Sequence, residues 1–140
     1  MEPFITLNEI DAAADYIRDR ITIKPRIGLV LGSGLGKLSD AVSDPTILQF
    51  NEIPSWPVST IHGHAGRLVI GDLFGVPSLV MQGRVHYYEG YAIDRVTLPI
   101  RVMQRLGIEI LILTNAAGAI NPDYVPGDVM LLVDHINMIG

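Results

Sequence analysis

Apolar residues recur along the first part of the chain at the spacing of an amphipathic helix. Each lies three or four residues from the next, so all fall on one helix face: Leu7, Ile10, Ala14, Ile17 and Ile21. Thr6 stands just before them and Glu9 follows it by three residues, which is the arrangement of a capping box. The pattern predicts a helix from about Leu7 to Arg20.

Three later runs are apolar at almost every position, which is typical of short strands that are covered on both faces. These runs are Ile27–Leu31, Glu109–Thr114 and Asp128–Asp134. Two further runs, Arg67–Asp72 and Val76–Gln82, flank a tripeptide that ends in Gly75. They predict a β-hairpin in which Gly75 adopts a backbone angle that other residues avoid.

A second helix is predicted after the hairpin. Its apolar positions keep helical spacing up to Leu106, while Asp94 is suited to cap its start and Gly107 to end it. Pro99 fits this helix poorly unless the helix begins late or is kinked.

The stretch 40–66 is irregular and rich in proline, which predicts a short helix, a short strand and a long loop. Helical and extended patterns therefore alternate along the chain. This alternation predicts an α/β fold, and no linker divides the chain, so residues 1–140 are expected to form a single domain.

Composition agrees with a compact domain and excludes several classes of protein. Apolar residues make up 49% of the chain and charged residues 18%, which argues against charge-driven disorder. The net charge is −5 and the ten Lys and Arg are scattered, so nucleic acid is not an expected partner. The chain has no cysteine, which excludes a disulfide framework and favours the reducing cytoplasm. We find neither a signal peptide nor a membrane span.

The first chemical motif is the glycine-rich run Gly32–Lys37, directly after a predicted buried strand. Glycines permit a tight turn and close approach of the backbone to an anion, and Ser33 offers a hydroxyl, so phosphate is the natural ligand. A dinucleotide fingerprint would need glycine where Lys37 stands, and the spacing of a P-loop is absent. The alternative is a turn that only reverses the chain.

The second motif is the dense run Gly83–Tyr91 at the end of an apolar strand, a common position for ligand sites in α/β sheets. In an extended chain Arg84, His86 and Tyr88 would project to one side and offer donors to an oxyanion and a sugar. Glu89 is placed to keep His86 protonated or to fix its tautomer. The alternative is a solvated loop.

The remaining motifs carry less information on their own. The run Thr114–Ala119 has small side chains that expose backbone N–H groups, but it is equally typical of a packing turn. His62 and His64 lie close together without a nearby third ligand, so no metal site is predicted. The pair Asp134-His135 is compatible with a buried polar pair or with a site contact.

Taken in order and spacing, four motifs resemble those of the trimeric purine nucleoside phosphorylases. They are Leu31–Gly36, His62–His64, Gly83–Gly90 and Thr114–Gly118. The string from His86 to Gly90 separates this group from the related methylthioadenosine phosphorylases. The resemblance spans nearly the whole chain and implies a mixed, mostly parallel twisted sheet flanked by helices, incomplete at its C-terminal end.

The resemblance also implies a set of site residues. The phosphate pocket would be formed by Ser33, Arg84, His86 and the backbone N–H of Ala116, with His64 approaching on a loop. His86 and Glu89 would be the catalytic residues, with Glu89 bracing His86, and Tyr88 would contact the ribose. Asn115 and Gly118 would shape the turn beneath phosphate and base.

The implied reaction is phosphorolysis of purine nucleosides or deoxynucleosides to a free base and the sugar 1-phosphate, a step of purine salvage. Inorganic phosphate is the co-substrate, no metal or organic cofactor is needed, and the partner expected is a homotrimer. Members of this family are about twice as long, and the Glu and Asn that bind the purine lie in their second half. A chain ending at Gly140 is therefore expected to be inactive and poorly soluble.

Two other interpretations follow from that difference in length. One is a non-catalytic phosphate or nucleoside module that retains the anion pocket without the base-binding half. The other is a structural fragment that matters only when paired with its complement. The sequence leaves the choice between 6-oxo and 6-amino purines open.

Overall fold

The computed structural model describes residues 4–59 and 65–138, and its first helix follows from the capping box. Helix α1 spans Leu7–Arg18. The N–H of Glu9 donates to Oγ1 of Thr6 at 3.2 Å, and the N–H of Thr6 donates to Oε2 of Glu9 at 2.9 Å. The predicted box is therefore confirmed, although the helix ends two residues before Arg20, where the chain turns.

The five strands form one mixed sheet in the order β2-β3-β4-β1-β5. Their bounds are β1 Ile27–Leu31, β2 Val42–Gln49, β3 Arg67–Leu73, β4 Val76–Gln82 and β5 Ile110–Leu113. Strands β4, β1 and β5 are parallel, whereas β2, β3 and β4 are antiparallel. The predicted hairpin is β3–β4, and its turn has positive φ at both Phe74 (54°) and Gly75 (85°), as two-residue hairpin turns require.

Helix α2 spans Ile93–Leu106 and begins one residue before the expected cap. Ala92 occupies the N-cap position, while Asp94 lies in the first turn and accepts the N–H of Ile5 at 2.9 Å. Pro99 is accommodated inside this helix and is buried. Gly107 ends it with φ at 88°, as predicted.

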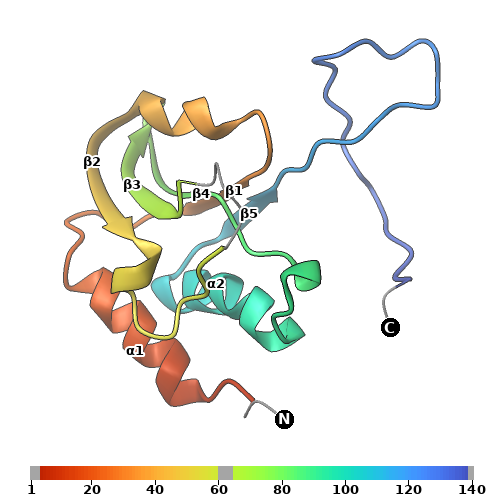
Figure 1. Ribbon diagram of the computed structural model, residues 1–140. Helices are drawn as coiled ribbons and strands as arrows, with labels where there is room; N and C mark the ends of the chain where they lie inside the picture. Colours follow the sequence, from red (N-terminus) through yellow and green to blue (C-terminus); the bar gives the residue numbers. More distant parts are fainter. Residues whose placement is uncertain (1–3, 60–64, 139–140) are drawn as a thin grey trace.

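The two helices lie together against one face of the sheet (Figure 1). Because side chains alternate along a strand, Val30 of β1 joins the helix-covered core, whereas Leu29 and Leu31 join a smaller core on the opposite face. The short helix η1, Gly36–Ala41, contributes Leu38 to that smaller core. The sheet is thus covered on both sides at β1, as its apolar run predicted.

The two other apolar runs behave differently from the prediction of buried strands. Strand β5 is an edge strand, and its four side chains are 37% to 64% exposed. Residues 128–134 form no strand in this structure, and Figure 1 shows this part of the chain (blue) extending away from the sheet. An apolar run shows that a segment can be buried, but a strand also needs a neighbouring strand that hydrogen-bonds its backbone. Within the described residues no strand lies beside 128–134.

Strand β1 lies between β4 and β5, and this order positions the candidate site. Leu31 is the register partner of Gln82, and Val30 is the partner of Leu113. Since all three strands run in the same direction, the turns that follow them emerge side by side at one edge of the sheet. Within residues 4–59 and 65–138, no helix is long and apolar enough to cross a membrane.

Candidate functional site at the carboxyl edge of the sheet

The glycine-rich run forms a tight turn directly after β1. The N–H of Leu35 donates to the carbonyl of Gly32 at 3.3 Å, and Gly34 has φ at 86°, which favours glycine. Gly32 is buried at the base of the turn, whereas Ser33 is exposed at its tip. The turn therefore presents the Ser33 hydroxyl at the sheet edge, where the sequence expects an anion.

Thr114 connects this turn to the end of β5. Its hydroxyl accepts the N–H of Gly32 at 2.8 Å and donates to the carbonyl of Val30 at 3.0 Å. The N–H of Thr114 also donates to that carbonyl, at 3.1 Å. One side chain thus fixes the spacing between the turns that follow β1 and β5.

Arg84 lies over the glycine turn from the other side. Its Nη1 donates to the carbonyl of Leu31 at 3.3 Å, and a Cβ placed on Gly32 would lie 3.0 Å from the same nitrogen. The same Cβ would lie 2.7 Å from the carbonyl oxygen of Thr114 and 3.1 Å from Cα of Asn115. Glycine is thus required at position 32 because three loops converge there.

The guanidinium of Arg84 supplies positive charge to this edge. It is half-buried and makes one hydrogen bond within the described residues, to Leu31. A guanidinium carries five N–H donors, so most of them remain to bind an anion, and Arg is well suited to oxyanions.

His86 and Glu89 are in direct contact, as the sequence suggested. The backbone N–H of His86 donates to Oε1 of Glu89 at 2.7 Å, and the Nδ1 atom of His86 lies 3.1 Å from the same oxygen. The Glu89 side chain is only 2% exposed and also accepts the hydroxyl of Ser59, at 2.9 Å to Oε2. A buried carboxylate that accepts several hydrogen bonds holds the imidazole in one orientation.

The segment after His86 differs from the extended chain that the sequence analysis assumed. Residues Tyr87–Glu89 form a 3₁₀ turn, η3, because the carboxylate of Glu89 bonds back to His86. Tyr88 therefore does not continue the row of Arg84 and His86 by alternation. Its ring stacks on the imidazole of His86 with centroids 4.8 Å apart, and the residue is 75% exposed.

The turn after β5 contributes less to the arrangement than expected. The backbone of Asn115 packs beside Gly32, and its side-chain amide donates to the carbonyl of Ala116 at 3.4 Å. Ala116 and Gly118 are exposed on the segment that leaves the sheet, and a Cβ at Gly118 would meet no atom within 4 Å. His62 and His64 lie outside the described residues.

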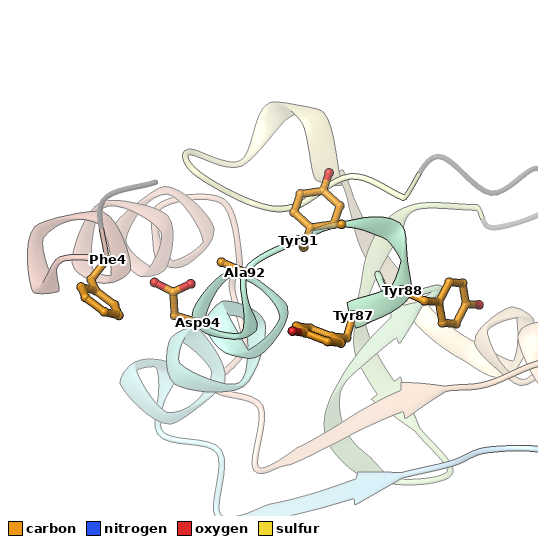
Figure 2. A pocket seen from close by; sticks show the side chains of 7 residues that line it. Phe4, Tyr87, Tyr88, Tyr91, Ala92 and Asp94 are labelled. Carbon is orange, nitrogen blue, oxygen red and sulfur yellow. The ribbon is translucent and has the colours of Figure 1, made fainter. Parts of the chain in front are cut away.

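An open hollow of about 510 Å³ adjoins the stacked pair of His86 and Tyr88. It is lined by Phe4, Tyr87, Tyr88, Gly90, Tyr91, Ala92 and Asp94. Phe4 and Asp94 lie at one end and Tyr88 at the other (Figure 2). The N–H of Ile5 lowers the pKa of Asp94, so that carboxylate is engaged in anchoring the N-terminal segment.

Three residues of this edge were missed as contributors by the sequence analysis. Ser59 supports Glu89, the Thr114 hydroxyl supports Gly32, and Gln82 donates to the carbonyl of Gly36 at 3.0 Å. Only Thr114 carried a signal, because it ends the apolar run Glu109–Thr114 and begins the run Thr114–Ala119. Within the described residues no group of three or more His, Asp or Glu is arranged to hold a metal ion.

Comparison with known proteins places the chain in a family. Residues 26–140 match the model of the Phosphorylase superfamily. The chain is 51% identical over 133 residues to purine nucleoside phosphorylase 1 of Bacillus subtilis. The aligned region covers 95% of this chain and 49% of the relative. The chain spans about half the length of the curated relatives it matches.

Solved structures give the same result. Isoform 2 of purine nucleoside phosphorylase from Schistosoma mansoni, in complex with cytosine and ribose 1-phosphate, matches with a TM-score of 0.77 at 43% identity. This match covers 84% of the chain and 41% of that structure. A schistosomal purine nucleoside phosphorylase in complex with hypoxanthine gives a TM-score of 0.79 at 44% identity, covering 88% and 43%.

The fold and the converging turns define an α/β protein with a candidate site at the carboxyl ends of parallel strands. Within that class, the match over residues 26–140 is specific. The chain belongs to the phosphorylase superfamily.

Proposed function

We propose that the protein catalyses the phosphorolysis of purine nucleosides or deoxynucleosides, releasing the purine base and the sugar 1-phosphate. The observation that carries this proposal is the convergence of Arg84 on the glycine turn, 3.0 Å from where a Gly32 Cβ would be. Ribose 1-phosphate and hypoxanthine, bound in two solved relatives, are a sugar phosphate and a purine base of the kinds this reaction yields.

Phosphate is proposed to bind between the turns that follow β1, β4 and β5. The donors are the hydroxyl of Ser33, the guanidinium of Arg84, the imidazole of His86 and the backbone N–H of Ala116, with His64 as a further contact from outside the described residues. The contact between His86 and Glu89, 3.1 Å from Nδ1 to Oε1, supports a fixed imidazole orientation. Glu89 therefore acts through His86.

The nucleoside is proposed to lie beside this anion. Tyr88 would contact the ribose, and its stacking on His86 together with its 75% exposure supports this assignment. Asn115, whose backbone packs against Gly32, and Gly118 would shape the turn beneath the phosphate and the base. The open hollow beside Tyr87 and Tyr88 gives room for the sugar.

The chemistry needs no strong nucleophile in the protein. Phosphate attacks C1′ as the bond from C1′ to the base nitrogen breaks, and the leaving base takes up a proton. The ribosyl centre gains positive charge on the way, so a bound anion held against it stabilises the transition state. Fixed donors and correct orientation supply most of the acceleration. We propose that no metal or organic cofactor takes part.

We also propose the compartment and the oligomeric state of the protein. The absence of cysteine supports the reducing cytoplasm. The resemblance to trimeric phosphorylases supports a homotrimer. Because the chain spans about half the length of its relatives, the groups that bind the purine are proposed to lie outside it.

The test combines phosphate titration with turnover of inosine. The 140-residue chain is titrated calorimetrically with inorganic phosphate, and hypoxanthine release from inosine is assayed with and without phosphate. Phosphate-dependent release supports phosphorolysis by the chain itself. Binding without release agrees with purine-binding groups that lie outside the chain, whereas absence of phosphate binding would contradict the proposed site. His86→Ala should weaken both signals, and equal signals for the two proteins would remove His86 from the mechanism.

A further inference from the structure

Gln82, the last residue of β4, makes a contact that neither the sequence analysis nor the proposed mechanism uses. Its Nε2 donates to the carbonyl of Gly36, the last glycine of the glycine-rich run, at 3.0 Å. Gly36 lies four residues beyond Gly32. The contact therefore joins the end of β4 to the far end of the turn that presents Ser33.

Arg67 fixes the direction of this amide. Arg67 and Gln82 are register partners across the antiparallel β3–β4 pair, and Nε of Arg67 donates to Oε1 of Gln82 at 2.6 Å. A guanidinium can only donate and an amide oxygen can only accept, so the oxygen of Gln82 must face Arg67. The amide NH₂ group must then face Gly36.

The hydrogen bond from Gln82 is not the only bond that the carbonyl of Gly36 accepts. The hydroxyl of Ser39, a buried residue, also donates to the carbonyl of Gly36, at 2.8 Å. That carbonyl would keep a partner without Gln82. The additional bond thus constrains where the turn lies rather than merely supplying a donor.

The turn is consequently held at both of its ends by side chains that lie at the carboxyl ends of the two strands that flank β1. Thr114 holds Gly32 from the β5 side, and Gln82 holds Gly36 from the β4 side. Ser33 lies between these anchors, and its hydroxyl makes no hydrogen bond within the described residues. Its position relative to Arg84 depends on both anchors.

We propose that Gln82, oriented by Arg67, is a positioning residue. It sets the position of the glycine turn relative to Arg84 so that Ser33 and Arg84 bind the same phosphate. This inference rests on the proposed function for the identity of the anion. Gln82 does not touch the anion itself. Arg67 acts only through the Gln82 amide.

The test compares Gln82→Met with Gln104→Met, the same substitution at an exposed position on α2. Calorimetric titration with inorganic phosphate is carried out where urea unfolding shows every variant to be fully folded. Gln82→Met should weaken phosphate binding about tenfold, the equivalent of one lost hydrogen bond, whereas Gln104→Met should bind as wild type. Equal affinities of Gln82→Met and wild type would overturn the inference.

Arg67 variants separate positioning from a general loss of structure. Arg67→Met should weaken phosphate binding in the same direction, and the double variant with Gln82→Met should bind no more weakly than Gln82→Met alone. Arg67→Lys, which keeps a donor toward Oε1, should restore most of the affinity. Additive losses in the double variant would contradict action of Arg67 through Gln82.

Amide spectra make the inference separable from the proposed function. In ¹H–¹⁵N spectra without phosphate, Gln82→Met should shift the amide signals of Ser33, Gly34 and Leu35 and leave those of α1 unchanged. If the wild-type chain binds no phosphate, the proposed function fails while these shifts still support positioning of the turn by Gln82. Unshifted turn amides would overturn it whatever the result for phosphate.

Discussion

The hydroxyl of Thr114 accepts the backbone N–H of Gly32 at 2.8 Å, one of three hydrogen bonds through which Thr114 joins the ends of β1 and β5 at the candidate site. Gly32 is buried, so its N–H has no access to water if the acceptor is lost. Thr114→Val keeps the shape of the side chain and removes the hydroxyl. It should lower the free energy of unfolding by about 1–3 kcal/mol, measured by urea denaturation. Thr114→Ser retains the hydroxyl and should stay close to wild type, and a valine variant as stable as wild type would contradict this role.

Gly32→Ala should disrupt the site because the added methyl group has no room. It would lie 2.7 Å from the carbonyl oxygen of Thr114 and 3.0 Å from Nη1 of Arg84. The two turns must then separate, and we expect phosphate affinity to fall below detection in calorimetry together with a stability loss of about 1–3 kcal/mol. Gly71→Ala is the matched control, since its added methyl group is also crowded, 2.5 Å from the carbonyl oxygen of Ser43, but lies on β3 at the opposite end of the sheet; it should keep the phosphate affinity of wild type. Equal phosphate affinities of the two variants would contradict a specific role of Gly32 at the site.

Glu89 variants distinguish orientation of the His86 ring from the effect of a negative charge. Gln at position 89 can still accept the N–H groups of His86 through its amide oxygen, and its NH₂ group can donate to the hydroxyl of Ser59. We therefore expect Glu89→Gln to keep phosphate affinity within about threefold of wild type and Glu89→Ala to lose about tenfold. Calorimetry with inorganic phosphate measures both. A glutamine variant as weak as the alanine variant would assign the role to charge instead.

Glu9 makes stability depend on pH in the acid range. The N–H of Thr6, then its hydroxyl and the guanidinium of Arg95, lower the pKa of Glu9 from its usual 4.5 to about 2. Its folded-state pKa is depressed, so its contribution to stability is present above about pH 4.5 and is lost as the pH falls toward 2. Unfolding by urea at pH 7, 4.5, 3 and 2 should show a flatter acid dependence for Glu9→Gln than for wild type. Parallel curves for the two proteins would be incompatible with this assignment.

The edge strand β5 should promote self-association of the chain. Its apolar side chains are exposed and its outer backbone groups are unpaired within the described sheet. Ile110→Lys places a charge on this strand and should reduce light scattering of concentrated solutions. Ile93→Lys changes an equally exposed isoleucine on helix α2, away from the sheet edge, and should leave the scattering unchanged. Equal effects would indicate that general hydrophobicity, not the strand, drives association.

Local chemistry explains which elements the sequence predicted. The capping box of Thr6 and Glu9, the hairpin turn at Gly75 and the C-cap at Gly107 each depend on a few neighbouring residues, and all three are present. The strand at 128–134 failed because strand formation needs a partner, and an apolar run does not specify one. The cap at Asp94 failed because a tertiary contact with Ile5 engages its carboxylate.

In the candidate site, too, local contacts were predicted from the sequence and contacts between distant residues were not. The glycine turn and the contact of His86 with Glu89 each lie within a single motif, so the spacing of the residues was enough to predict them. The supporting contacts of Gln82 with Gly36 and of Ser59 with Glu89 join residues 46 and 30 positions apart. They depend on sheet register and loop path, which a single sequence does not specify.

The central place of β1 determines when the protein can acquire its site during synthesis. Ile27 pairs with Ser78 on one side and with Ile110 on the other. The first strand to be synthesised therefore cannot be fully paired until both of these later strands have been synthesised. Such distant pairings form slowly and late. The nascent chain is therefore expected to pass through an interval in which β1 is exposed and is open to chaperones that bind apolar segments.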